Sequence, residues 1–100
     1  MPRLRVDLQD GFDGEAVLVE LDGKAVYRQD EVRTRYQVGL ADVIERDVAD
    51  GRHALAIRLL RQDAAWQDSI DVKGETHVGV SLSASGTLEV TVEDRPFRYA

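Results

Sequence analysis

Residues 17–27, VLVELDGKAVY, carry two apolar runs on either side of an Asp-Gly pair. Apolar side chains recur at every second position, which is the period of a β-strand with one face in a core. A type I′ turn requires positive φ at both central residues, and Gly adopts that conformation at no steric cost. The stretch therefore predicts a β-hairpin that turns at Asp22 and Gly23.

The same alternation continues on both sides of this hairpin, with turn signals at intervals of roughly 8 to 12 residues. It is clearest in residues 4–8, 53–59, 70–72, 78–82 and 88–92. Short strands joined by tight turns are typical of two packed sheets. A chain of 100 residues has room for one core. We therefore expect residues 1–100 to form a single all-β domain, an Ig-like antiparallel β-sandwich of seven to nine short strands.

Three positions follow the alternation less simply. Residues 41–50, ADVIERDVAD, fit a strand or a helix, and we favour a strand because β-branched residues dominate the segment. Tyr36 alternates with Val38, which predicts that both side chains face the core. Trp66 lies in RQDAAWQD, residues 61–68, which we expect to be a polar loop.

The composition excludes several classes of partner and site. A net charge of -6 disfavours nucleic acid, which is bound mainly through cations. Without cysteine there is no disulfide, thiolate metal site or cysteine nucleophile. No stretch approaches the roughly 20 apolar residues of a membrane span. We expect a soluble chain, either cytoplasmic as written or a segment of an envelope or exported protein. The preference for Arg over Lys resembles that of a GC-rich bacterium.

Two stretches resemble the bacterial PEGA domain, a small β-sandwich. GEAVLVELDGKAV, residues 14–26, is similar to the strand, Asp-Gly turn and next strand of that family. ADGRHALAIRLL and SIDVKGETHVGVSL, residues 49–60 and 69–82, are similar to its later strand and closing hairpin. Together they cover roughly half of the chain. The resemblance implies a non-catalytic module attached to other domains of bacterial envelope or surface proteins, and no cofactor.

Two metal sites are conceivable from the residue types. The turn DLQDGFDGE places four acids within one short stretch, and calcium is held by carboxylate and carbonyl oxygens of such loops. The alternative is a solvated turn that protects a sheet edge. The calcium candidates are Asp7, Asp10, Asp13 and Glu15. His53 and His77 could share zinc if their strands were sheet neighbours. The alternative is that His53 bonds to turn backbone and that His77 faces away from the core.

A binding surface could be built from aromatic and basic residues. Trp66 could stack on a sugar or anchor a protein interface, or it could cap one end of the core. Tyr27 and Tyr36 could extend such an aromatic platform if their hairpin lies alongside, although the alternation favours the core for Tyr36. Arg28, Arg33 and Arg35 form a local basic patch for an anionic partner, although neighbouring acids would neutralise much of it.

No motif points to catalysis. The serines lack the Gly-x-Ser-x-Gly context that exposes a nucleophile, and the glycines are scattered singly at turns. We therefore expect a non-enzymatic accessory module that binds a protein partner through sheet edges or end loops. The alternative is a carbohydrate-binding module that uses Trp66, and a more distant one is a small hydrolase.

Overall fold

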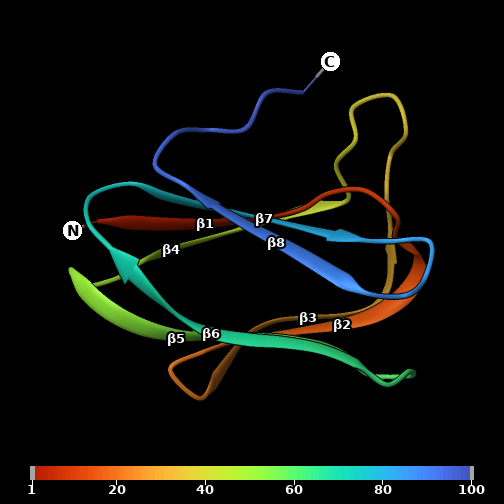
Figure 1. The fold of residues 1–100 in the computed structure, drawn as a ribbon, viewed down its shortest axis with the longest axis horizontal. Helices are drawn as coiled ribbons and strands as arrows, with labels where there is room; N and C mark the ends of the chain where they lie inside the picture. Colours follow the sequence, from red (N-terminus) through yellow and green to blue (C-terminus); the bar gives the residue numbers. More distant parts are fainter. Residues whose placement is uncertain (1, 100) are drawn as a thin grey trace.

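The alternating sequence folds into eight β-strands in two four-stranded sheets that pack face to face (Figure 1). The computed structural model describes residues 2–99. The predicted all-β sandwich is confirmed. The strands are β1 (Arg3–Leu8), β2 (Asp13–Leu21), β3 (Lys24–Arg33), β4 (Asp42–Asp47), β5 (Gly51–Leu59), β6 (Ala64–Val72), β7 (Thr76–Leu82) and β8 (Leu88–Glu93).

Sheet A has the strand order β4-β1-β7-β8, and sheet B has the order β3-β2-β5-β6. All neighbours are antiparallel except β1 and β7, which run parallel, so one pair departs from the antiparallel pairing that we expected. Parallel neighbours need a long crossover. Here the crossover contains all of sheet B together with β4.

The core lies between the two sheets and consists of the apolar residues that alternate along the strands. Sheet A contributes Leu4, Val6 and Leu8 from β1, and Val78 and Val80 from β7. From β2 and β5, sheet B contributes the buried residues Val17, Val19, Leu21, Leu55, Ile57 and Leu59. Burying each large apolar side chain stabilises the fold by roughly 1.5–3 kcal/mol. Within residues 2–99 no helix has the length and apolarity of a membrane-spanning segment.

The predicted hairpin turns at Asp22 and Gly23, with φ of 51° and 82°. Both values are positive, as a type I′ turn requires, so this prediction is confirmed. The Asp22 carboxylate also accepts a hydrogen bond from the backbone N–H of Ala54 (2.9 Å) and lies 2.6 Å from the ring of His53. The turn residue therefore ties the β2–β3 hairpin to β5.

Residues 42–47 form strand β4, so the strand that we favoured for this segment is confirmed. β4 pairs with β1 at one edge of sheet A. Tyr27 of β3 donates a hydrogen bond to the Asp42 carboxylate (2.8 Å), and Arg46 of β4 donates one to the carbonyl of Val26 (2.6 Å). These bonds close the sandwich along its β3–β4 side.

Three details differ from the sequence predictions. Tyr36 and Val38 are exposed rather than in the core, because residues 34–41 leave the sheet as a loop. Trp66 lies on β6 opposite Ile57, not in a loop, so its indole packs against the core. The turn at residues 73–75 joins β6 to β7, which belong to different sheets, so it does not close a hairpin.

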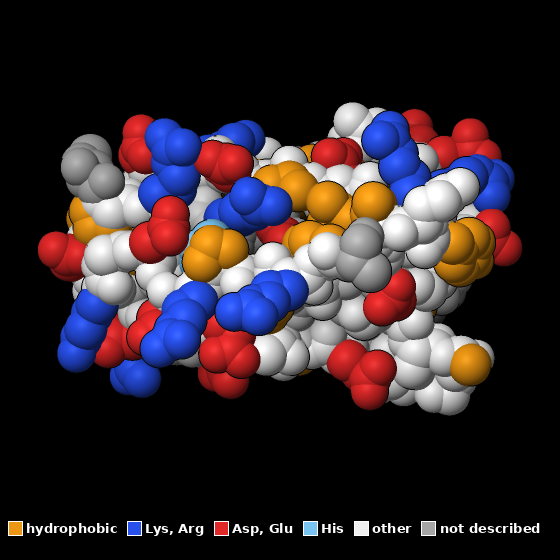
Figure 2. Space-filling view, turned by 90° about the horizontal axis from the view of Figure 1, so that it is seen from above, with side chains coloured by type: hydrophobic (Ala, Val, Ile, Leu, Met, Phe, Trp, Pro, Cys, Tyr) orange, Lys and Arg blue, Asp and Glu red, His pale blue; other side chains and the backbone are white. Residues whose placement is uncertain are grey.

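Residues 94–99 return across the outer face of sheet A (Figure 1). The ring of Phe97 meets that of His77 edge-on at a centroid distance of 6.5 Å, and Tyr99 donates a hydrogen bond to Asp7. Asp7 and His77 point away from the core, as alternation predicts, yet both are buried. Figure 2 looks onto this face and shows hydrophobic side chains gathered along its middle, between charged ones.

Candidate functional site

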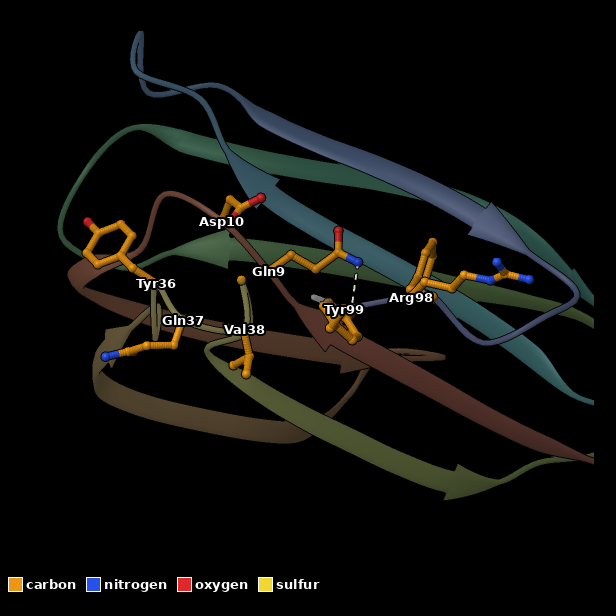
Figure 3. A pocket seen from close by; sticks show the side chains of 9 residues that line it. Gln9, Asp10, Tyr36, Gln37, Val38, Arg98 and Tyr99 are labelled. Carbon is orange, nitrogen blue, oxygen red and sulfur yellow. Dashed lines mark hydrogen bonds between the residues drawn. The ribbon is translucent and has the colours of Figure 1, made fainter.

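A hollow of about 380 Å³ lies where the 34–41 loop meets the C-terminal segment. Residues 9–10, 36–39 and 97–99 line it. Figure 3 shows Tyr36 and Gln37 on one side, Arg98 and Tyr99 on the other, and Gln9 between them. We call this the end hollow. It combines aromatic rings, side-chain amides, the carboxylate of Asp10 and the guanidinium of Arg98.

The 34–41 loop owes its shape to local backbone bonds. The N–H of Arg35 donates to the carbonyl of Leu40 (3.0 Å), and the N–H of Gly39 donates to the carbonyl of Arg35 (2.8 Å). Gly39 has a φ of 67°, which favours glycine. This tight turn directs Tyr36, which is 80% exposed, and Val38, which is 40% exposed, out into solvent.

Thr34 anchors the start of the loop. Its buried hydroxyl accepts a hydrogen bond from the N–H of Phe12 (3.0 Å) and donates one to the carbonyl of Gln9 (2.6 Å). Phe12 is itself fully buried in the core. The exposed Tyr36 is therefore carried by a loop whose base is fixed to the sandwich.

Gln9 and Tyr99 form the inner wall of the end hollow. The Gln9 amide donates to the Tyr99 hydroxyl (3.0 Å), which in turn donates to Asp7 (2.5 Å). Burial, followed by the hydrogen bond to Asp7, raises the pKa of Tyr99 to about 12. Arg5 donates to the other Asp7 oxygen (2.7 Å). This network holds the C-terminal segment against sheet A.

Gly79 explains how Gln9 reaches this position. A Cβ at Gly79 would lie 2.8 Å from the amide nitrogen and oxygen of Gln9. Because Gly79 has no side chain, the side chain of Gln9 can occupy this space beside β7. The inner wall depends on this small residue in the middle of sheet A.

The four calcium candidates take part in separate interactions. Asp7 is buried against Arg5 and Tyr99, and Asp10 lines the end hollow. Asp13 pairs with Arg33 (2.9 Å), while the Glu15 carboxylate accepts a bond from the N–H of Asp13. Among the residues that the structure describes, no three His, Asp or Glu side chains converge as metal ligands would.

The two histidines lie in different sheets, since β5 belongs to sheet B and β7 to sheet A. The condition for a shared zinc site was that their strands be neighbours, so that hypothesis is wrong. The His53 ring bonds to the Ala49 carbonyl (2.7 Å), in agreement with the predicted bond to turn backbone. His77 is 3% exposed; its Nε2 lies 3.1 Å from a Glu75 oxygen, without the alignment of a hydrogen bond.

The predicted aromatic and basic residues do not share one surface. Tyr27, Arg33 and Arg35 line a second hollow of about 420 Å³ beside β3. Arg33 is paired there with Glu31 (3.0 Å) and Asp13, and these acids raise the pKa of its guanidinium, the hydrogen bond to Glu31 foremost. Its charge is therefore already balanced.

The other two predicted binding residues, Arg28 and Trp66, lie outside this second hollow. Arg28 lies 3.8 Å from Asp30, with both side chains exposed. Trp66 lies on β6, at the opposite edge of sheet B from β3. The Trp66 ring is partly buried against the core. Stacking of a sugar on this ring stays a prediction.

The end hollow was missed at the sequence level. Period-two alternation assigned Tyr36 and Val38 to the core, and the return of residues 94–99 over sheet A has no local signal except the break at Pro96. Gly39 within the alternating run was the one available hint of a turn. No family model matches the chain, and the search of curated proteins finds no match either.

Proposed function

We propose that this β-sandwich is a non-enzymatic interaction module that binds a protein partner through the end hollow. The observation that carries the proposal is the exposure of Tyr36 next to Val38 on a firmly anchored loop. Tyrosine is enriched where proteins meet, because its ring offers a large contact area and loses little side-chain entropy on binding.

The surroundings support a protein as the ligand. The hollow places the polar groups of Gln9, Asp10 and Arg98 beside the exposed side chains of Tyr36 and Val38. Interfaces between proteins combine apolar and polar groups. Because the loop is already ordered by its backbone bonds, binding would cost little conformational entropy.

The resemblance to PEGA domains extends this proposal to an Ig-like, PEGA-like accessory module of a bacterial protein. The Asp22-Gly23 hairpin and the β5 strand that follows Gly51 support it, since both stand where the resemblance expects them. The crossing from β6 to β7 departs from the closing hairpin of that family. The resemblance therefore rests on residues 14–26 and 49–60.

The test is capture of a partner by matched variants. The immobilised protein is exposed to a lysate of its source organism, beside a Tyr36→Ser, Val38→Ser double variant and a Leu60→Ser control, whose exposed side chain follows the end of β5. We expect the wild type and the control to retain the same stoichiometric protein, and the double variant to lose it. Equal retention by the double variant, or no retained protein, would contradict the proposal. A glycan array with Trp66→Ala as its control tests the carbohydrate alternative.

A further inference from the structure

Each sheet of the sandwich has two edges, formed by β4 and β8 in sheet A and by β3 and β6 in sheet B. An edge strand presents unpaired backbone N–H and C=O groups to which another strand can add. Proteins usually block such edges with bulges, with inward-pointing charges or with a cover. The four edges of this sandwich differ in how they are blocked.

The β3 and β4 edges are closed against each other. Asp42 and Arg46 of β4 lie opposite the core residues Leu8 and Leu4, so they are charges on the inner face, and both bond to β3. The pairing of β3 with β2 also shifts register three times, which marks an irregular strand. Neither edge offers a regular row of free backbone groups.

The β6 edge carries one charge that points inward. Asp68 lies opposite Leu55, which is buried in the core, and therefore faces the inner side of sheet B. Any strand added to β6 would bring its inner side chains next to this carboxylate. An inward charge of this kind disfavours pairing at an edge.

β8 carries no inward-pointing charge and no register shift among its described residues. Leu88, Val90 and Val92 lie opposite the core residues of β7 and so face inward. Their exposure rises along the strand, from 8% at Leu88 to 45% at Val92. The apolar inner layer therefore continues to this edge, where β6 of the other sheet lies close to β8, and it is exposed at Val92. No backbone hydrogen bond joins residues 89–93 to any described strand other than β7.

The charges on the outer face of β8 determine which charges an added strand should carry. Glu89 and Glu93 alternate with the inward valines and are exposed. Opposite charges directly across two strands stabilise pairing, and like charges destabilise it. A strand that adds to β8 should therefore carry Lys or Arg on its outer side and apolar residues on its inner side.

A second copy of this chain does not meet that requirement. Pairing β8 with β8 antiparallel about Thr91 sets Glu89 of one copy against Glu93 of the other. The outer residues of β4 include Glu45 and Asp47, which are also acidic. The fitting partner is a different chain.

We propose that β8 accepts an added strand from another protein, an extended segment in which apolar and basic residues alternate. This inference shares with the proposed function only the binding of protein, since its residues are separate from the end hollow. The added strand would extend sheet A, cover Val92 and pair its cations with Glu89 and Glu93. Main-chain bonds would supply affinity, and the alternation would supply specificity.

The test uses two synthetic peptides as long as β8, one alternating Lys and Val and one alternating Glu and Val. Binding is followed by amide chemical shifts of the labelled protein and by the emission of Trp66, the only tryptophan of the chain. We expect the Lys-Val peptide to bind and to shift the amides of β8. A Glu89→Lys, Glu93→Lys variant should bind it about tenfold more weakly and prefer the Glu-Val peptide.

Two further variants complete the test. Val92→Asp places on β8 an inward charge like the one that β6 already has. It should weaken the binding of both peptides by about tenfold or more. The Tyr36→Ser, Val38→Ser variant should bind the Lys-Val peptide as the wild type does, which separates this inference from the proposed function. The inference is overturned if the Lys-Val peptide does not bind, if the charge exchange leaves its affinity unchanged, or if the shifts fall on other strands and spare β8.

Discussion

The imidazole of His53 lies 2.6 Å from the carboxylate of Asp22, and its other ring nitrogen lies 2.7 Å from the carbonyl of Ala49. Both neighbours are hydrogen-bond acceptors, so only the protonated ring, with two N–H donors, satisfies both. The hydrogen bond to Asp22 is the main cause that raises the pKa of His53, and the bond to Ala49 adds to it. The same contact lowers the pKa of Asp22.

The first prediction is a pH-dependent stability from this pair. A raised His53 pKa contributes stability below the ordinary value of 6.5 that is lost as pH rises through the raised pKa. A lowered Asp22 pKa contributes stability above 3.8 that is lost as pH falls through the lowered pKa. The melting temperature of the wild type should exceed that of Asp22→Asn most between these two values, and the difference should shrink at alkaline pH. A difference independent of pH would contradict this account.

The second prediction concerns the anchor of the 34–41 loop. Thr34→Val keeps the shape of the side chain but leaves the N–H of Phe12 and the carbonyl of Gln9 without their buried partner. Urea denaturation should show a loss of about 2–3 kcal/mol. Thr34→Ser retains the hydroxyl and serves as the control, with a smaller loss. Equal losses would show that the methyl group, not the hydroxyl, holds the loop.

The third prediction compares two glycines with positive φ. Gly11 lies against the end of β7, and a Cβ there would meet the carbonyl oxygen of Leu82 at 1.8 Å. Gly23 occupies the hairpin turn with nothing within 4 Å of such an atom. Gly23→Ala should cost about 1 kcal/mol from backbone strain alone. Gly11→Ala should cost about 3 kcal/mol or more, because a backbone contact cannot yield. Thermal denaturation distinguishes the two variants. Similar losses of stability would be inconsistent with the close contact between Gly11 and Leu82.

The fourth prediction concerns the attachment of the C-terminal segment. Tyr99→Phe removes the hydroxyl that joins Gln9 to the buried Asp7, and should destabilise the protein by about 1–3 kcal/mol. Tyr36→Phe is the matched control, because that side chain is exposed and the change should stay within about 0.5 kcal/mol. If both variants unfold at the same urea concentration, the Asp7 network does not hold the segment.

Features determined by neighbouring residues could be predicted from the sequence. The Asp22-Gly23 turn depends on two residues and their φ values, and the alternation of the strands depends on the residues at positions i and i+2. The sandwich followed from these patterns. Strand β4 also followed, because β-branched residues favour a strand.

Features set by contacts between distant residues could not be predicted. The base of the loop that carries Tyr36 is fixed because Thr34 is bonded to Gln9 and Phe12, which precede it by more than twenty positions. His77 is buried because Phe97 covers it from the end of the chain. Alternation indicates on which face a side chain lies, but not whether another segment later covers that face. Both walls of the end hollow come from such contacts.

The most direct test of the central claim is site-specific photocrosslinking at the end hollow. A photoreactive phenylalanine analogue replaces Gln37, which lines the hollow, and in a matched control it replaces Gln67, which is exposed on β6. We expect illumination in a lysate of the source organism to link one protein to the variant at position 37 and none at position 67. The absence of an adduct at position 37, or equal adducts at both positions, would contradict the assignment of the end hollow as a protein-binding surface.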